Sequence, residues 1–124
     1  MSDTATAPFL TAWFEILDGE EPARVLDLIS DDFFLSILFS TGDGEATDFS
    51  GDRAALVGYL DQREKGTRTH HLLSAATLGR DEVFLGEVRR TGVPEASFVA
   101  AGRLNGEGRL ERLLIGRSSQ VRFT

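Results

Sequence analysis

Four strand-like segments separated by short turn sequences fill the second half of the chain, and they restrict its fold more than any other feature. We predict strands over 69–78, 82–91, 96–104 and 109–118. The sequences between them, Gly-Arg-Asp, Gly-Val-Pro and Asn-Gly-Glu-Gly, have the composition of tight turns. Turns this short join neighbouring antiparallel strands. The second half is therefore predicted to be an antiparallel meander.

The first half has the residue spacing of helices. Phe9, Trp13 and Leu17 recur at helical intervals before an Asp-Gly pair ends the run. Pro22 suits the first turn of a second short helix, where its missing N–H costs nothing. Three further segments complete this half, namely a strand at 33–40, a polar loop at 41–48 and a third helix at about 51–64.

This order of elements is that of an α+β domain, with helices packed on one face of a curved antiparallel sheet. The 124 residues contain no linker, internal repeat or low-complexity stretch. About 100–150 residues is the commonest size of a single domain. Residues 1–124 are therefore expected to form one domain.

Composition excludes several kinds of site. The chain has no cysteine, so it can form no disulfide, thiolate nucleophile or cysteine-ligated metal site. Its two histidines, His70 and His71, are too few for most protein-ligated transition-metal sites. We therefore expect no metal site, and we also expect no organic cofactor. The net charge of −7 repels phosphate backbones, which disfavours binding to nucleic acid.

Membrane association is also not expected. The apolar stretch 33–39 is far shorter than the about 20 residues that span a bilayer. Residues 1–4 lack the basic and apolar regions of a signal peptide. The sequence thus predicts a cytoplasmic location.

Three local features carry a resemblance to a known family. They are the Asp18-Gly19 helix end, the Ser-Asp-Asp step at 30–32 and the Asn-Gly-Glu-Gly hairpin at 105–108. With the order of elements, they make the chain resemble the nuclear-transport-factor-2-like superfamily, and within it the small bacterial SnoaL-like proteins. The resemblance implies a cone-shaped half-barrel, in which three N-terminal helices pack on a strongly curved antiparallel sheet around one deep pocket.

Members of that superfamily include ketosteroid isomerases, dehydratases, epoxide hydrolases, polyketide cyclases and binders without activity, so the fold does not decide the function. The resemblance places the two ketosteroid isomerase carboxylates at Ile37 and Ala100, which are both apolar. Neither can abstract or donate a proton, and we expect no such activity. An epoxide hydrolase needs two aspartates around an arginine, but Asp81 is the sole aspartate after position 61 and lies in a turn.

His70 is the candidate catalytic residue, because the resemblance gives it the pocket position on its strand. Ser74 is expected on the same face, and His71 on the opposite face with Leu73 and Ala75, since adjacent strand residues alternate. The two histidines then cannot bind one metal together. A neutral imidazole in an apolar pocket can act as acid or base near neutral pH. The alternative is a structural histidine, bound to backbone or placed at a subunit contact.

Strand alternation and the family register also predict a mostly apolar pocket. Glu87 and Arg89 share one strand face, and they join His70 if that face points inward. The simpler reading is that the pair faces solvent or a second subunit. The predicted lining residues are Trp13, Leu17, Ile37, Phe39, Tyr59, Phe98 and Ala100.

Two functions remain open from the sequence. One is a cofactor-independent isomerase, dehydratase or cyclase acting on a small apolar molecule through His70. The other is a non-catalytic binder or a dimeric interaction module. The helices can cover only one face of a single sheet. The other, outer face is therefore expected to pack against a second copy of the chain in a homodimer. The residues predicted to face outward are Phe34, Leu38, Val99, Leu110 and Leu114.

Overall fold

A computed structural model describes residues 7–40, 46–62 and 68–123 of the chain. Both α-helices have ten residues, and no helix in these ranges is long and apolar enough to cross a membrane. The elements are α1 (Pro8–Leu17), the 3-10 helix η1 (Pro22–Leu28), β1 (Ile29–Ser40), β2 (Ala46–Asp52), α2 (Arg53–Gln62), β3 (Arg68–Leu78), β4 (Asp81–Arg90), β5 (Val93–Leu104) and β6 (Leu110–Ser118).

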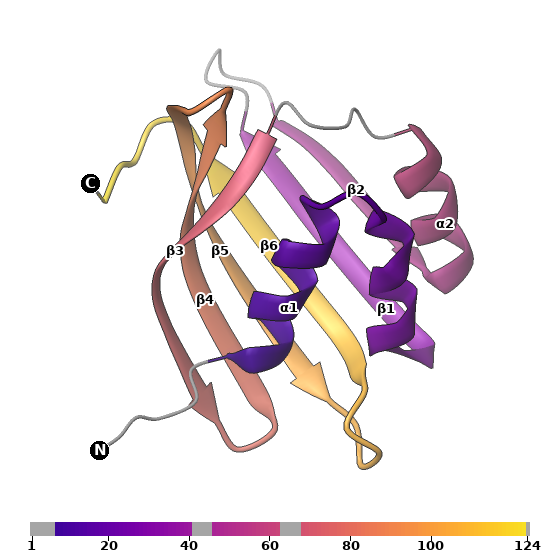
Figure 1. Cartoon of the computed structure of the whole chain (residues 1–124). Helices are drawn as coiled ribbons and strands as arrows, with labels where there is room; N and C mark the ends of the chain where they lie inside the picture. The colour runs from indigo at the N-terminus through magenta and orange to yellow at the C-terminus, as the bar shows by residue number, and fades with distance from the viewer. Residues whose placement is uncertain (1–6, 41–45, 63–67, 124) are drawn as a thin grey trace.

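The strands form one six-stranded sheet in the order β2-β1-β6-β5-β4-β3, and the sheet is not closed. β3 to β6 make the predicted antiparallel meander. β1 also pairs with β2 in antiparallel fashion, but its pairing with β6 is parallel, which makes the sheet mixed. No turn joins β1 to β6, so tertiary packing sets their relative direction. The three helices lie on one face of the bent sheet, as the α+β cone requires (Figure 1).

The strand β2 was not expected from the sequence, which indicated a polar loop over part of this segment. Its residues are mostly polar, and it owes its conformation to pairing with the edge of β1. The ring of Phe49 stacks on that of Tyr59 at 4.9 Å between centroids, which ties β2 to α2. The helix then begins at Arg53, where the Asp52 carboxylate accepts a hydrogen bond from the Ala55 backbone N–H at 3.0 Å.

The core lies between the helices α1, η1 and α2 and the concave face of the sheet. The predicted register of β5 is confirmed, since Phe98 is 3% exposed and Ala100 is fully buried, whereas Val99 is 47% exposed. Phe84 and Val88 of β4 are buried on the same inner face. Alternation therefore decides which side chains reach the space under α1.

A carboxylate from the sheet holds the start of α1. Ala7, with φ 53°, offers no side-chain cap to the helix. Instead, the buried Glu82 of β4 accepts hydrogen bonds from the backbone N–H groups of Phe9 at 3.1 Å and Leu10 at 2.8 Å. These are donors that a helix leaves without an internal partner. Glu82 thereby fixes where α1 lies across the sheet.

The outer face of the sheet carries exposed apolar side chains, as expected for Phe34, Leu38, Val99 and Leu114. The prediction for Leu110 is wrong, because its side chain is fully buried. The pairing of β5 with β6 shifts register between Arg103 and Leu104, so Leu110 turns to the inner face.

Candidate functional site

A partly enclosed cavity of about 190 Å³ lies between the helices and the concave face of the sheet. Most of its lining is apolar, with four polar or charged side chains among it. The lining residues are Trp13, Phe14, Leu17, Ile37, Leu56, Tyr59, Arg68, His70, Val88, Phe98, Ile115 and Arg117.

Most of the residues expected in a pocket come together here. The side chain of Phe39 lies outside the described residues. The predicted residues that line the cavity are Trp13, Leu17, Ile37, Tyr59, His70 and Phe98.

Ala100 was expected in the lining, but it is fully buried away from the cavity. It is on the inner face of β5 as predicted, with Phe84 and Ile115 as its neighbours on the adjacent strands. Two residues further along β5, a Cβ atom on Gly102 would lie 3.2 Å from Leu10 of α1. The helix therefore packs closely on this part of the strand, where the core replaces the cavity.

His70 is held in the cavity wall by Asp18, the residue that ends α1. The Asp18 Oδ1 atom lies 2.9 Å from His70 Nδ1, and its Oδ2 atom accepts the His70 backbone N–H at 2.6 Å. The two side chains are only 13% and 16% exposed. An ionised carboxylate can only accept hydrogen bonds, so Nδ1 carries the proton. In a neutral imidazole, Nε2 is then the basic nitrogen.

Two aromatic rings fix the plane of the His70 imidazole. Phe14 stacks on it at 4.8 Å between centroids, and Phe98 meets it edge-on at 5.2 Å. Both phenylalanines also line the cavity. The imidazole therefore has one preferred orientation in an apolar surrounding.

The expected partner of His70 on its strand, Ser74, does not share its face. The pairing of β3 with β4 shifts register between Leu72 and Ser74, which leaves Ser74 exposed and Ala75 packed against the core. His71 is absent from the cavity lining, and its Nε2 atom lies 2.7 Å from Thr69 Oγ1. Among the described residues, no group of three or more His, Asp or Glu side chains could hold a metal ion.

Glu87 and Arg89 form an ion pair with 2.8 Å between Oε2 and Nε. Both lie on the face of β4 opposite Val88, which lines the cavity. They therefore do not join His70. Arg89 is partly exposed, but Glu87 is buried within the chain, so the expectation that the pair faces solvent is wrong for Glu87.

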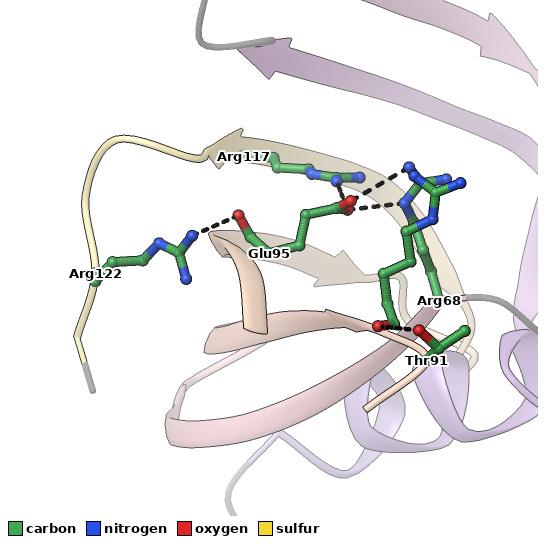
Figure 2. Close-up of polar contacts among 6 residues, drawn as sticks. Arg68, Thr91, Glu95, Arg117 and Arg122 are labelled. Atoms are coloured by element: carbon green, nitrogen blue, oxygen red, sulfur yellow. Dashed lines mark hydrogen bonds and ion pairs between the residues drawn. The ribbon is translucent and has the colours of Figure 1, made fainter. Parts of the chain in front are cut away.

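A cluster of Arg68, Glu95 and Arg117 adjoins the cavity and was not expected from the sequence. Figure 2 shows the Glu95 carboxylate between the two guanidinium groups, with 2.8 Å to Arg68 Nε and a closer contact to Arg117 Nη2. The hydrogen bond from Arg68 is the main reason why the pKa of Glu95 lies below its usual value. Burial lowers the pKa of Arg117, although an arginine remains protonated in proteins.

Trp13 supplies a hydrogen-bond donor without a partner. Its side chain is 2% exposed and lines the cavity. Among the described residues, its Nε1 atom is a buried side-chain polar atom with no hydrogen-bond partner. A buried indole N–H usually finds an acceptor. A bound molecule with a suitably placed oxygen would supply one.

Comparison with solved structures decides the fold. IdmH from Streptomyces antibioticus, named as a candidate polyketide cyclase, superposes with a TM-score of 0.69 at 14% identity over 90% of this chain and 91% of that chain. A candidate isomerase of the SnoaL-like family from Agrobacterium tumefaciens gives 0.66 at 12% identity, over 89% and 94%. An NTF2-like protein of unknown function from Cytophaga hutchinsonii gives 0.64 at 9% identity, over 94% and 93%.

The chain has the fold of nuclear transport factor 2, the NTF2-like fold. No protein-family model matches the sequence, and no curated protein matches it. At the identities found, the similarity establishes the NTF2-like fold and leaves the activity to the side chains of the site.

Some site residues that were not predicted do have a signal in the sequence. Others have no local signal at all. Alternation with Phe84 would have indicated Val88 as a lining residue, because both lie on the inner face of β4. The contact between Asp18 and His70 joins positions 52 residues apart, and no local pattern announces it.

Proposed function

We propose that the protein binds a small, mostly apolar carbonyl compound in the cavity and that His70 transfers a proton in a cofactor-independent isomerisation, dehydration or cyclisation. The observation that carries this proposal is the Asp18–His70 pair in the cavity wall, which leaves Nε2 as the basic nitrogen. The names of two similar structures, a candidate polyketide cyclase and a candidate isomerase, support the same class of reaction.

The proposed chemistry starts at a C–H bond next to the carbonyl group. His70 Nε2 takes the proton, the electron pair moves onto the carbonyl oxygen, and the Trp13 N–H stabilises the resulting enolate. Asp18 stabilises the imidazolium that forms, so it is a positioning residue. Where a C=C bond is conjugated with the enolate, return of the proton to the far carbon of that bond gives an isomer. Loss of a β-hydroxyl as water gives a dehydrated product, and attack of the enolate on a second carbonyl closes a ring.

An exchange experiment tests the proton transfer without knowledge of the natural substrate. The probe is 2-tetralone, a bicyclic ketone, in deuterated buffer, and the measurement is the loss of its α-proton signals by NMR. We expect the protein to accelerate exchange, and His70→Gln to slow the enzymatic rate at least about 100-fold, the usual contribution of a general base. Asp18→Asn should slow it as well, while tetralone binding persists in both variants.

The matched control is His71→Gln, because His71 lies outside the cavity lining on the same strand. This variant should retain the full exchange rate. An exchange rate in His70→Gln equal to that of the wild type would contradict the catalytic role.

Non-catalytic binding is the second candidate, and the apolar side chains of Ile37 and Ala100 favour it. They stand where the resemblance places the carboxylates of ketosteroid isomerases, so that source of proton transfer is absent at these positions. Binding of tetralone with no acceleration of exchange would establish this alternative for that class of ligand.

We also propose that the protein is a homodimer through the outer face of the sheet. Phe34, Leu38, Val99 and Leu114 are each about half exposed on that face. Soluble monomers rarely leave large apolar patches in water. A twofold axis would let the same face bind its own copy in a closed dimer.

A further inference from the structure

The contact between Phe98 and His70 spans a strand of the sheet. Phe98 lies on β5 and His70 lies on β3, and β4 runs between them. Neighbouring strands are about 4.8 Å apart, so the two backbones are separated by roughly 10 Å. The ring centroids nevertheless lie only 5.2 Å apart, with 87° between the ring planes. The two side chains therefore meet above β4.

Gly86 is the residue of β4 that leaves room for this contact. It stands directly opposite Phe98 in the β4–β5 pairing, on the same inner face as Phe84 and Val88. A Cβ atom on Gly86 would lie 2.5 Å from Phe98 Cε1 and 2.8 Å from the His71 carbonyl oxygen. Ordinary contacts of a Cβ atom begin at 3.4 Å. The Phe98 ring thus occupies the space that every residue other than glycine would fill.

The backbone of Gly86 does not itself require glycine. Its φ is not positive, whereas Gly92 in the next turn has a φ of 85°. Glycine inside a strand provides no side chain to pack, and it often marks a place where another group approaches closely. At Gly86 that group is the ring of Phe98.

The Phe98 ring has little freedom to move away from such a Cβ atom. It is 3% exposed, and the rings of Phe14 and Phe84 contact it at 5.0 Å and 5.7 Å between centroids. To restore an ordinary contact, its Cε1 atom would move by about 1 Å. The ring would then press on the imidazole of His70 or withdraw from it into the cavity, which Phe98 also lines. Either movement changes the position of the imidazole.

We propose that Gly86 is a positioning residue for His70, because its missing side chain leaves the space from which the Phe98 ring holds the imidazole at the cavity wall. This inference rests on the proposed function, since it concerns the residue that transfers the proton there. Asp18 holds the imidazole from the end of α1 through a hydrogen bond, and Phe98 holds it from the sheet through packing. Together they set the direction in which Nε2 points.

Gly86→Ala tests this role in the exchange reaction of 2-tetralone. We expect the maximal exchange rate per folded molecule to fall at least about tenfold, because a displacement of about 1 Å can cost roughly 100-fold in rate. The tetralone concentration at half-maximal rate should change much less. Gly116→Ala is the matched control, because Gly116 is also a strand glycine and a Cβ atom there meets open space. It should keep the wild-type rate.

The nitrogen resonances of the imidazole report its position without catalysis. The chain has two histidines, so the NMR spectrum of His70→Gln identifies the signals of His70. In the wild type, the neutral ring should carry its proton on Nδ1, where the Asp18 carboxylate accepts it. We expect Gly86→Ala to move these signals and to increase the share of the form protonated on Nε2. Gly116→Ala should leave them unchanged.

A double-mutant cycle tests whether Gly86 acts through Phe98. Phe98→Leu should by itself slow exchange and move the His70 signals, because the edge of the ring is lost. Gly86→Ala added to Phe98→Leu should then cause little further loss, since the ring that it would displace is absent. If Gly86→Ala alone does not fold, Phe98→Leu and the double variant still decide the question.

A wild-type rate and unchanged His70 signals in Gly86→Ala would overturn the positioning role and leave the proposed function standing. So would a higher half-maximal concentration at an unchanged maximal rate, because Gly86 would then shape only the cavity. Losses that add in the double variant would refute an action through Phe98. A wild-type protein that does not accelerate exchange would refute the proton transfer, and the His70 signals would still decide whether Gly86 positions the imidazole.

Discussion

Single side chains from distant parts of the sequence set the chemistry of the cavity. Asp18 orients His70, and Glu95 orients Arg68 and Arg117. In each case a carboxylate accepts hydrogen bonds from N–H groups, and these bonds fix the orientation of the imidazole or guanidinium group that donates them. The cavity wall therefore presents an oriented imidazole and two arginines held by a carboxylate, within a mostly apolar lining.

The pKa of Glu95 leads to a prediction about stability and pH. Because the folded protein lowers this pKa below the ordinary 4.5, the ionised side chain stabilises the fold at pH values above 4.5. That stabilisation is lost as pH falls through the lower folded-state value. We expect Glu95→Gln to reduce the free energy of unfolding by about 1 kcal/mol at pH 7, given a partly exposed group.

Urea unfolding of both proteins at pH 7 and at pH 3 measures this difference. The gap between wild type and Glu95→Gln should narrow at pH 3. The control is Glu107→Gln, which removes an exposed carboxylate from the β5–β6 turn and should cause little change at either pH. A gap that stays constant from pH 7 to pH 3 would contradict the electrostatic origin of the effect.

At the level of elements, α1 matters most, because it covers the sheet and supplies Trp13, Phe14 and Leu17 to the cavity. Its first turn depends on Glu82 of β4. Glu82→Ala would leave one buried and one partly buried N–H group without an acceptor, and an unsatisfied buried donor costs roughly 1–3 kcal/mol. We expect a loss of stability of at least about 2 kcal/mol, measured by urea unfolding.

Glu82→Gln should lose less stability than Glu82→Ala, since its amide oxygen still accepts one of the two hydrogen bonds. Glu15→Ala is the control, because Glu15 is exposed on the same helix and should be almost neutral. Equal stability of Glu82→Ala and wild type would show that the start of α1 does not need this carboxylate.

For the whole molecule, the main expectation is the homodimer. Light scattering should give about twice the chain mass of 13.5 kDa at micromolar concentration. Leu114 is 60% exposed on the outer face, and Leu114→Glu should yield the monomer mass with an unchanged circular dichroism spectrum. In this variant the carboxylates introduced in the two subunits would repel each other across the twofold interface, and both would lose hydration there.

Val93→Glu is the control for the dimer, since Val93 is equally exposed but lies at the start of β5 beside the turn. It should leave the dimer mass unchanged. A wild-type protein that remains at 13.5 kDa would rule out this interface.

The sequence by itself determined the order of the elements other than β2, and the inner face of β5. Helical spacing, strand alternation and turn composition act over a few residues, so α1 and the meander from β3 to β6 could be predicted without tertiary contacts. For the same reason Phe98 and Ala100 were correctly placed on the buried face.

Only the tertiary structure decided the irregular and long-range features. The mostly polar β2 forms by pairing with β1, and register shifts turn Leu110 inward and Ser74 outward. The contact of Asp18 with His70 depends on where α1 ends above β3, and the arginine cluster depends on an additional residue in β5. Local composition cannot encode these contacts, because each needs two segments that meet only after the sheet has formed.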